Sequence, residues 1–498
     1  MKTVKVLAFD FGASSGRAVV AEFDGEKIVL NEIHRFSNDP VQLGDTLFWD
    51  TPRQIFEIKQ GLMKLASSGI ETDSLGIDTW GVDFGLIGED GRMLENPVHY
   101  RDRRTSGMKD ELFKIITREK IYELTGIQFM EINTIYQLFA LVKKRPALIS
   151  RAKRLLLIPD LFNYFLTGIM NTELSMASTT QLLDANKKEY SPEILNALGI
   201  SAELFPPVTD CGFILGGISD DVAAEVGLKG KKIKVISVAA HDTQSAVISV
   251  PAAESGFAYI SSGTWSLIGT ELVAPLINET TLAYNFTNEL SACGTVNFLK
   301  NVTGLWLIQE SRRAWRREGS EYSYSQLENL ALKAEPFVSF IDPDDPAFAT
   351  PGDIPGRVRE FCSRTGQHIP ETTGDIMRCI YESLALKYRY VLENLESCTG
   401  KRFEKLYVVG GGTKDTLLCA MTASACGIPV LSGPTEATVY GNTVIQLIAL
   451  GKISSLTEAR GVIARSEPIK EYYPESHIEW NSAYEKAKEI YIINSAIK

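Results

Sequence analysis

The residue types best suited to chemistry first occur together near the beginning of the chain. Residues 8–17 read Ala-Phe-Asp-Phe-Gly-Ala-Ser-Ser-Gly-Arg and lie between two apolar runs. The small residues after Asp10 predict a loop that can direct several backbone N–H groups at one anion. Gly12 and Gly16 are expected to adopt backbone angles that a Cβ would forbid. Asp10 can hold a hydrated Mg²⁺ over the same phosphate groups. An ordinary hairpin turn with a solvated aspartate is the alternative.

A second candidate for chemistry is the tripeptide His241-Asp242-Thr243. A β-rich run at 231–240 precedes it and a helical pattern follows, and α/β folds place ligands at the carboxyl ends of strands. A general base beside a hydroxyl must be ionised, as an aspartate with an ordinary pKa of about 4 is at pH 7. Asp242 is therefore the candidate base. A helix N-cap role is the alternative and is compatible with it.

A tryptophan–glycine break interrupts the apolar run at 75–87, which predicts two strands. Gly81 allows the backbone to approach a ligand closely, and Asp78 and Asp83 can accept hydrogen bonds from sugar hydroxyls. A glycine bulge beside a packed Trp80 is the alternative.

Three glycines at 410–412 separate a predicted strand at 406–409 from a predicted helix at 415–425. Such a loop lets the backbone lie against a ring or a phosphate at a helix N-terminus. The spacing is not G-x-G-x-x-G, and no P-loop lysine follows. The Rossmann and Walker interpretations are therefore excluded.

The elements that must position these residues indicate two similar halves. The run 257–266 again breaks into a loop of Ser, Gly and Thr, and 267–273 is expected to return as a strand. One strand–loop–strand unit per half predicts duplicated halves facing each other. We expect an α/β, two-domain, actin-like ATPase (ribonuclease H-like) fold with a central cleft. The predicted domains are an N-terminal sugar-binding domain at 1–248 and a C-terminal nucleotide-binding domain at 249–498.

Composition limits the possible partners and the compartment. The 498 residues include 51 basic and 62 acidic ones, for a net charge of −11, which argues against nucleic acid or an anionic membrane surface. No apolar stretch reaches the roughly 18 residues of a membrane span, and no leader pattern opens the chain. The seven cysteines form no C-x-x-C pair, so we expect a cytoplasmic protein with reduced thiols and no zinc. Cys362 and Cys379 are the one candidate pair for a disulfide, and buried or surface thiols are the favoured alternative. The oligomeric state, monomer or homodimer, stays open.

Several stretches, in order from residue 6 to about residue 450, together resemble the FGGY family of carbohydrate kinases, which has the actin-like fold. They are Asp-Phe-Gly-Ala-Ser-Ser-Gly-Arg at 10–17, Gly-Ile-Asp-Thr-Trp-Gly-Val-Asp-Phe at 76–84, Tyr-Arg-Asp-Arg-Arg-Thr at 100–105, His-Asp-Thr-Gln-Ser-Ala-Val at 241–247, Ser-Ser-Gly-Thr-Trp-Ser-Leu at 261–267, Lys-Asn-Val-Thr-Gly-Leu-Trp-Leu at 300–307 and Val-Val-Gly-Gly-Gly at 408–412.

The resemblance implies a role for each matching position. Asp242 resembles the base that takes the proton from the 1-hydroxyl of a ketose, and Asp10 is expected near the Mg²⁺ that accompanies ATP. Sugar contacts are implied for Gly81, His241, Asp242, Thr243 and Asn301. ATP contacts are implied for Ala13, Ser14, Ser15, Gly16, Arg17, Thr264, Gln309 and Gly411.

The implied reaction is ATP plus L-rhamnulose giving ADP and L-rhamnulose 1-phosphate. Another deoxyketose such as L-fuculose is the alternative substrate. A non-kinase actin-like ATPase and a sugar sensor without catalysis are more distant alternatives. Trp80-Gly81-Val82-Asp83 and His241-Asp242 favour a kinase, because the ATPases have no sugar site.

Two positions depart from the family pattern. Asp415 stands where the family usually has Asn, and it either repels the nucleotide or caps the following helix. Leu290-Ser291 stands where the family tends to have Gly-Gly, which bears on substrate choice if that loop borders the sugar.

Overall fold

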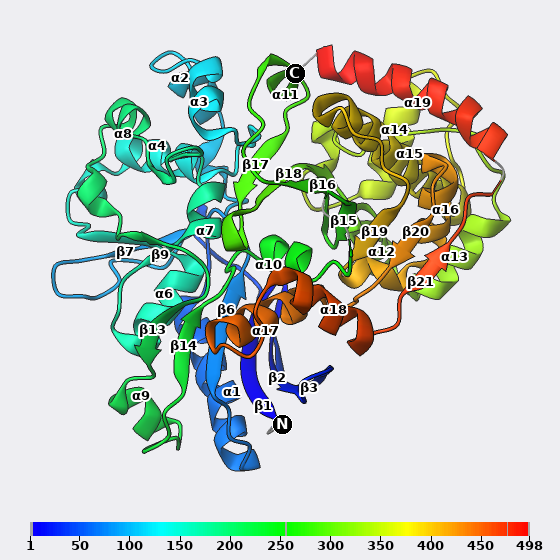
Figure 1. Cartoon of the computed structure of the whole chain (residues 1–498). Coiled ribbons are helices and arrows are strands. Elements are labelled where there is room, and N and C mark those ends of the chain that lie inside the picture. Colours follow the sequence, from blue (N-terminus) through cyan, green and yellow to red (C-terminus); the bar gives the residue numbers. More distant parts are fainter. Residues whose placement is uncertain (1–2, 254–255, 476, 497–498) are drawn as a thin grey trace. The chain divides into compact units, whose positions relative to one another are not determined.

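The computed structural model describes residues 3–253, 256–475 and 477–496 (Figure 1). The chain divides into two compact units, each built from several segments. The first comprises Met1–Ala253, Glu271–Phe298 and Ala437–Glu467, and the second comprises Glu254–Thr270, Leu299–Glu436 and Pro468–Lys498. The predicted division placed a single boundary between 248 and 249. The compact units differ from it because two later segments pack with the first unit.

A six-stranded sheet forms the centre of the first unit, in the order β13-β14-β6-β1-β2-β3 (Figure 1). Its strands are β1 (Val4–Phe11), β2 (Ser15–Phe23), β3 (Ile28–Ser37), β6 (Ser74–Thr79), β13 (Phe213–Gly217) and β14 (Lys234–Ser237). Strands β1, β2 and β3 are antiparallel neighbours, whereas β6 runs parallel to both β1 and β14. The carboxyl ends of β1, β6 and β14 therefore lie at one edge of the sheet.

Alternating side chains of β1 pack on opposite faces of this sheet, as the period of a strand requires. Phe9 and its like-facing neighbours pack in one apolar cluster with α1 (Thr51–Ser68) and α6 (Ile158–Thr167). Val6 packs in a second cluster with α17 (Ala437–Ala449). Helix α10 (Asp242–Ile248) contacts α17. The first unit thus has a helix–sheet–helix arrangement.

The first unit contains further elements outside this six-stranded sheet. They are β4 (Val41–Leu43), β5 (Thr46–Phe48), β7 (Phe84–Ile87), α2 (Met108–Leu112), α3 (Arg118–Thr125), α4 (Thr134–Lys144), α5 (Pro146–Ile149), β8 (Arg154–Leu157), β9 (Thr172–Glu173), α7 (Leu174–Thr179), β10 (Leu183–Asp184), β11 (Glu189–Tyr190), α8 (Pro192–Leu198), β12 (Val208–Thr209), α9 (Asp220–Glu225), α11 (Glu279–Ala283), β17 (Thr287–Leu290) and α18 (Leu456–Ser466).

The second unit repeats the strand plan of the first. Its strands lie in the order β18-β16-β15-β19-β20-β21, with β15 antiparallel to β16 and parallel to β19. They are β15 (Ala258–Ser262), β16 (Trp265–Leu272), β18 (Val296–Thr303), β19 (Leu406–Val409), β20 (Val430–Ser432) and β21 (Lys470–Tyr472). The unit boundaries cross β16 and β18. Because β1, β2 and β6 have the same relation in the first unit, the predicted internal duplication is confirmed at the level of topology.

Helices of the second unit surround the long α15 (Thr373–Thr399). Thr372 and Asp375 form a capping box at its start, and Gly400 ends it with a φ of 66°. The others are α12 (Trp306–Arg317), α13 (Tyr324–Lys333), α14 (Ile354–Arg364), α16 (Thr416–Cys426) and α19 (His477–Ala496). Across the described ranges, no helix is both long and apolar enough to span a bilayer.

Candidate active site

Three aspartates are close to one another at the carboxyl edge of the first sheet. Asp10 is the last residue but one of β1 and is the strand partner of Asp78 on β6. The end of β6 bridges to residue 241, so that Asp242 follows at the start of α10. Both Asp10 and Asp242 act electrostatically on Asp78. The structure thus brings the predicted metal-site residue and the predicted base to one place.

The loop between β1 and β2 is a tight turn held from the side by Asn38. The Gly12 N–H donates to the carbonyl of Ser15 at 2.9 Å, and the Asn38 amide donates to the carbonyl of Gly12 at 2.8 Å. Ser14 and Ser15 are exposed. Arg17 donates two hydrogen bonds to the carboxylate of Asp10, at 2.9 and 2.7 Å. Asp10 is therefore not a simply solvated turn residue.

The predicted reason for the two glycines of this loop is wrong. Neither Gly12 nor Gly16 has a left-handed φ. Gly16 is an extended strand residue opposite Phe11. An ideal Cβ on Gly16 would lie 2.3 Å from the Phe36 ring, so packing against that ring excludes a side chain there.

Asp78 is fully buried, and a side chain from distant sequence holds one of its oxygens. Asn442 on α17 donates to Oδ2 at 2.6 Å. No described hydrogen-bond donor reaches Oδ1. Burial, together with the nearby charge of Asp10, raises the pKa of Asp78 well above its ordinary value. Asp78 therefore adds a buried acid to the site and has no open surface for a sugar.

Asp242 is the first residue of α10, with His241 at the N-cap position. Its Oδ1 accepts from the Thr243 N–H at 2.6 Å and lies 3.4 Å from the His241 Nε2 atom. About a third (32%) of the side chain is exposed. Partial burial raises the pKa of Asp242, His241 opposes the rise, Asp10 adds to it, and the net shift is upward. His241, and not Asp242, thus occupies the N-cap position, and the Asp242 carboxylate accepts from the next N–H instead of one two or three residues later.

His241 lies between Asp242 and a residue that sequence reasoning missed. Its Nδ1 atom is 3.1 Å from Oε2 of Glu289, at the end of β17. Its ring also faces Gly81, where an ideal Cβ would lie 3.2 Å from Nε2. The structure therefore brings together Gly81, His241, Asp242 and Thr243, the sugar-contact residues predicted for the first unit.

Asp83 is an internal anchor, and the prediction that it accepts sugar hydroxyls is wrong. Its carboxylate accepts from the indole N–H groups of Trp49 at 2.6 Å and Trp80 at 3.0 Å, from the Tyr100 backbone and from Gln137. These four bonds occupy a buried group that offers about four acceptor sites. Burial raises the pKa of Asp83 to about 6. Asp83 fixes the backbone that carries Gly81.

The predicted nucleotide residues of the second unit lie on its strand–loop–strand turn and on the helices beside it. The Thr264 hydroxyl is 3.5 Å from the Gln309 side-chain oxygen, and the Leu305 N–H donates to the carbonyl of Gly263 at 3.1 Å. These contacts join the β15–β16 loop to the start of α12. Asn301 lies on β18. The helix begins only at Trp306, after Gly304.

The surroundings of the three glycines after β19 differ in how much space they leave for a side chain. An ideal Cβ on Gly412 would lie 2.0 Å from the Ser262 hydroxyl, and one on Gly410 would lie 3.1 Å from the Ser262 carbonyl. Packing against β15 thus requires both. Around Gly411, no described atom lies within 4 Å of an ideal Cβ. This open backbone fits the close approach of a ligand.

Asp415 caps the helix that follows the glycines. Its Oδ1 accepts from the Leu418 N–H at 2.9 Å, and its Oδ2 accepts from the Tyr381 hydroxyl at 2.9 Å. Burial raises its pKa. The capping interpretation of this departure is therefore confirmed.

The other departure, Leu290-Ser291, ends β17 beside the site. The Leu290 N–H donates to the Ser178 hydroxyl at 3.1 Å, and the Ser291 N–H donates to the Thr295 carbonyl. Both side chains are buried. The pair directly follows Glu289, so it helps to fix the strand end that carries this carboxylate toward His241.

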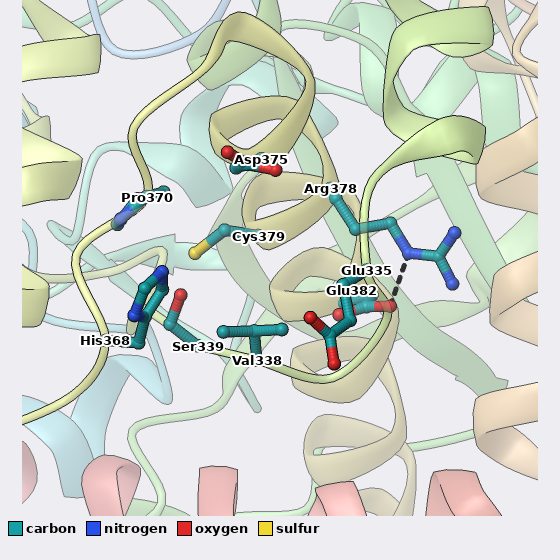
Figure 2. A pocket seen from close by; sticks show the side chains of 9 residues that line it. All are labelled: Glu335, Val338, Ser339, His368, Pro370, Asp375, Arg378, Cys379 and Glu382. Atoms are coloured by element: carbon teal, nitrogen blue, oxygen red, sulfur yellow. Dashed lines mark hydrogen bonds and ion pairs between the residues drawn. The ribbon is translucent and has the colours of Figure 1, made fainter.

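A pocket of about 220 Å³ lies in the second unit, and none of the predicted site residues lines it (Figure 2). Figure 2 shows Arg378 directed toward Glu382, with which it forms an ion pair, and the Cys379 sulfur on the wall. The lining residues are Glu335, Val338, Ser339, His368, Pro370, Asp375, Arg378, Cys379 and Glu382.

The seven cysteines form no disulfide bond. Cys362 and Cys379 are buried free thiols, and the other five cysteines are free as well. In the described part of the chain, no group of three or more acidic, His or Cys side chains is arranged to hold a metal by itself.

Comparison with solved structures shows the fold. The chain matches gluconate kinase from Lactobacillus acidophilus with a TM-score of 0.82 at 16% identity, over 99% of both chains. It matches Plasmodium falciparum glycerol kinase with ADP with a TM-score of 0.76 at 15% identity, over 98% of both chains. The actin-like, ribonuclease H-like fold is therefore confirmed.

Sequence comparison shows the family. The chain is 44% identical to a rhamnulokinase of Bacteroides thetaiotaomicron over 96% of this chain and 97% of that relative. It is 41% identical to a rhamnulokinase of Bacillus subtilis over 94% and 95%. Residues 5–249 match the N-terminal domain of the FGGY family of carbohydrate kinases, and residues 258–450 match its C-terminal domain. The chain belongs to the FGGY family of carbohydrate kinases.

Proposed function

We propose that the protein transfers the γ-phosphoryl group of ATP to the 1-hydroxyl of L-rhamnulose, giving L-rhamnulose 1-phosphate and ADP. The observation that carries this proposal is the gathering of Gly81, His241 and Asp242 at one sheet edge. These are positions that the family resemblance assigns to the sugar. The similarity to proteins named rhamnulokinase supports L-rhamnulose as the substrate.

Asp242 is the proposed general base. Its carboxylate accepts the proton of the 1-hydroxyl while the sugar oxygen forms a bond to the γ-phosphorus. The bond between that phosphorus and the bridging oxygen of ADP breaks, and ADP leaves with the electron pair. Oδ1 is held by the Thr243 N–H, so the carboxylate has a fixed orientation. Positioning and charge stabilisation, rather than a covalent intermediate, carry phosphoryl transfer.

The carboxylates at this edge fit a metal ion that accompanies ATP. The Asp78 Oδ1 atom is buried, lacks a donor among the described residues and faces Asp10. Two neighbouring acids, of which Asp78 is fully buried, favour a cation nearby. We propose that Asp10 holds hydrated Mg²⁺, which when bound would neutralise phosphate charge. The ATP contacts implied for 13–17 and for Thr264, Gln309 and Gly411, and the sugar contact of Asn301, stay predictions. The exposed Ser14 and Ser15 and the open backbone at Gly411 support the ATP contacts.

ADP release with Mg-ATP, measured against a panel of ketoses, tests the proposal. The panel contains L-rhamnulose, L-fuculose, L-ribulose and D-xylulose at equal concentrations. We expect L-rhamnulose to give the highest kcat/KM. A higher kcat/KM with L-fuculose would overturn the choice of substrate, and no stimulation by any ketose would favour the ATPase or sensor alternatives.

Replacement of the proposed base tests its role. We expect Asp242→Asn to lower kcat by about 10²- to 10⁴-fold, the usual contribution of a general base, while calorimetry shows that the sugar still binds. Asp220→Asn, an exposed aspartate in the first turn of α9, is the matched control and should retain full activity. Near-normal turnover of Asp242→Asn would remove Asp242 from the role of base.

A further inference from the structure

A buried chain of polar contacts runs from β18 through Glu289 to Asp242. The Asn297 amide donates to the side-chain oxygen of Gln244. The Gln244 amide then donates to Oε2 of Glu289 at 2.6 Å. The same Oε2 lies 3.1 Å from Nδ1 of His241, and Nε2 of that ring lies 3.4 Å from Oδ1 of Asp242. All five side chains belong to the first unit.

The direction of these bonds fixes the state of the His241 ring. The Glu289 carboxylate accepts hydrogen bonds only, so the Gln244 NH₂ group is turned toward it and the Gln244 oxygen accepts from the Asn297 amide. For the same reason, His241 carries a proton on the Nδ1 atom that faces Glu289. A neutral ring in this tautomer would present a bare nitrogen to the Asp242 carboxylate. A ring protonated on both nitrogens would present an N–H to each carboxylate.

The charges around His241 favour the doubly protonated ring. Burial alone lowers the pKa of His241, but Glu289, Asp242 and Glu173 outweigh it and raise the pKa above its ordinary value. Glu289 is 5% exposed and Gln244 is fully buried, so little water screens the pair. A protonated His241 in turn opposes the upward shift in the pKa of Asp242 that partial burial and Asp10 produce.

We propose that Glu289 is a positioning residue that acts through His241, holding the ring as a cation with Nε2–H directed at Asp242 so that this carboxylate is oriented and stays ionised. The inference rests on the proposed role of Asp242 as the base. A carboxylate behind a functional histidine commonly sets its tautomer and orientation. Glu289 would thus support the base without touching the sugar.

Histidine NMR tests the coupling in the wild-type chain, without any assay of activity. The chain has five histidines, so ¹⁵N-histidine labelling gives few signals, and the loss of one in His241→Asn assigns His241. We expect both His241 nitrogens to be protonated at pH 7. In Glu289→Gln the His241 pKa should fall by about one unit or more, the size of a partner worth 1.4 kcal/mol. A neutral His241 in the wild type, or an unchanged titration in the variant, would overturn the proposal.

Kinetics test the consequence for the base. We expect Glu289→Gln to lower kcat about 10- to 100-fold, as for other residues that orient a functional histidine. The acidic limb of its kcat/KM profile should move to higher pH, because Asp242 loses its cationic neighbour. Glu289→Asp should recover part of kcat. A merely structural role would lower kcat without moving the limb.

Glu57→Gln is the matched control. Glu57 is also buried and also pairs with a histidine, His34, at 2.6 Å, but on α1 and β3. The acidic limb of the kcat/KM profile of Glu57→Gln should coincide with that of the wild type. A shift of this limb equal to that in Glu289→Gln would overturn the proposal. If His241 titrates as expected but Asp242→Asn stays active, the coupling holds while the proposed base, and with it the catalytic meaning of Glu289, is overturned.

Discussion

Gly81 and His241 are in such close contact that the site depends on the absence of one methyl group. An ideal Cβ on Gly81 would lie 3.2 Å from Nε2 and 3.3 Å from Cδ2 of the His241 ring, and 3.4 Å from a methyl group of Thr179. Val82, the next residue, has a φ of 67°, a left-handed conformation that is costly for a β-branched side chain. The Val82 carbonyl accepts from the Thr134 hydroxyl at 2.6 Å, which helps to hold this conformation.

We expect Gly81→Ala to weaken sugar binding about tenfold or more, which corresponds to about 1.4 kcal/mol. The added methyl would press on the His241 ring and fill the side from which the backbone approaches a ligand. Isothermal titration calorimetry with the preferred ketose measures the effect. Gly217→Ala on β13 is the control, because its Cβ would lie 3.7 Å from the nearest atom. Unchanged affinity in Gly81→Ala would mean that the glycine serves only a bulge in the backbone.

At the scale of elements, the position of Asp242 depends on how α10 and α17 cross. An ideal Cβ on Gly441 of α17 would lie 1.8 Å from the carbonyl oxygen of Ser245 in α10. The obstacle is backbone, which cannot turn aside as a side chain can. The neighbouring Asn442 holds Asp78 and also donates to the carbonyl of Gly76 at 3.2 Å. One helix therefore supports two of the three aspartates at the sheet edge.

We expect Gly441→Ala to lower the free energy of unfolding by about 1–3 kcal/mol, the usual cost of overpacking, and to lower kcat as α10 moves. Urea unfolding and steady-state kinetics measure the two effects. Gly461→Ala in α18 is the matched control, since its Cβ would lie 3.4 Å from the end of the Arg465 side chain and alanine favours helix. It should be neutral or stabilising. A Gly441→Ala protein with wild-type stability and kcat would contradict the tight crossing.

At the scale of the whole molecule, a buried histidine links the stability of the fold to pH. The His99 ring packs against Trp49 and Tyr100, with ring centroids 4.2 and 4.5 Å apart. Its Nδ1 atom accepts a hydrogen bond from the Arg101 N–H at 2.9 Å. Burial, with a smaller contribution from Arg101, lowers the pKa of His99 to about 3. Between about pH 6.5 and pH 3, His99 is therefore protonated in the unfolded chain but neutral in the folded state.

The sign of this linkage follows from the lowered pKa. The contribution of His99 to stability is complete above about pH 6.5 and is lost as the pH falls toward 3. We expect the wild type to lose about 2 kcal/mol between pH 7 and pH 5 relative to His99→Phe, which cannot titrate. Urea unfolding of both proteins at the two pH values measures it. A constant difference between them would show that His99 does not titrate as inferred.

The sequence by itself determined the local features of this protein. Strand ends, loops of small residues and helix caps such as Thr372 with Asp375 are set by neighbouring residues, so their patterns are short and readable. The resemblance to a kinase family rests on such stretches, and it singled out Asp242, His241 and Gly81, which lie together in the structure. Local patterns also misled: Gly16 suggested a special backbone angle, whereas packing against the Phe36 ring is what excludes a side chain there.

Only the tertiary structure decided which distant residues complete the site. Asn442 reaches Asp78 across 364 positions of sequence, and Glu289 reaches His241 across 48. Such contacts leave no periodic signal, because they depend on how whole elements pack. The same packing turned Asp83 inward, where its charge and polarity alone suggested a ligand-facing acid. The sequence therefore indicated the chemistry, whereas long-range packing selected the side chains that hold it in place.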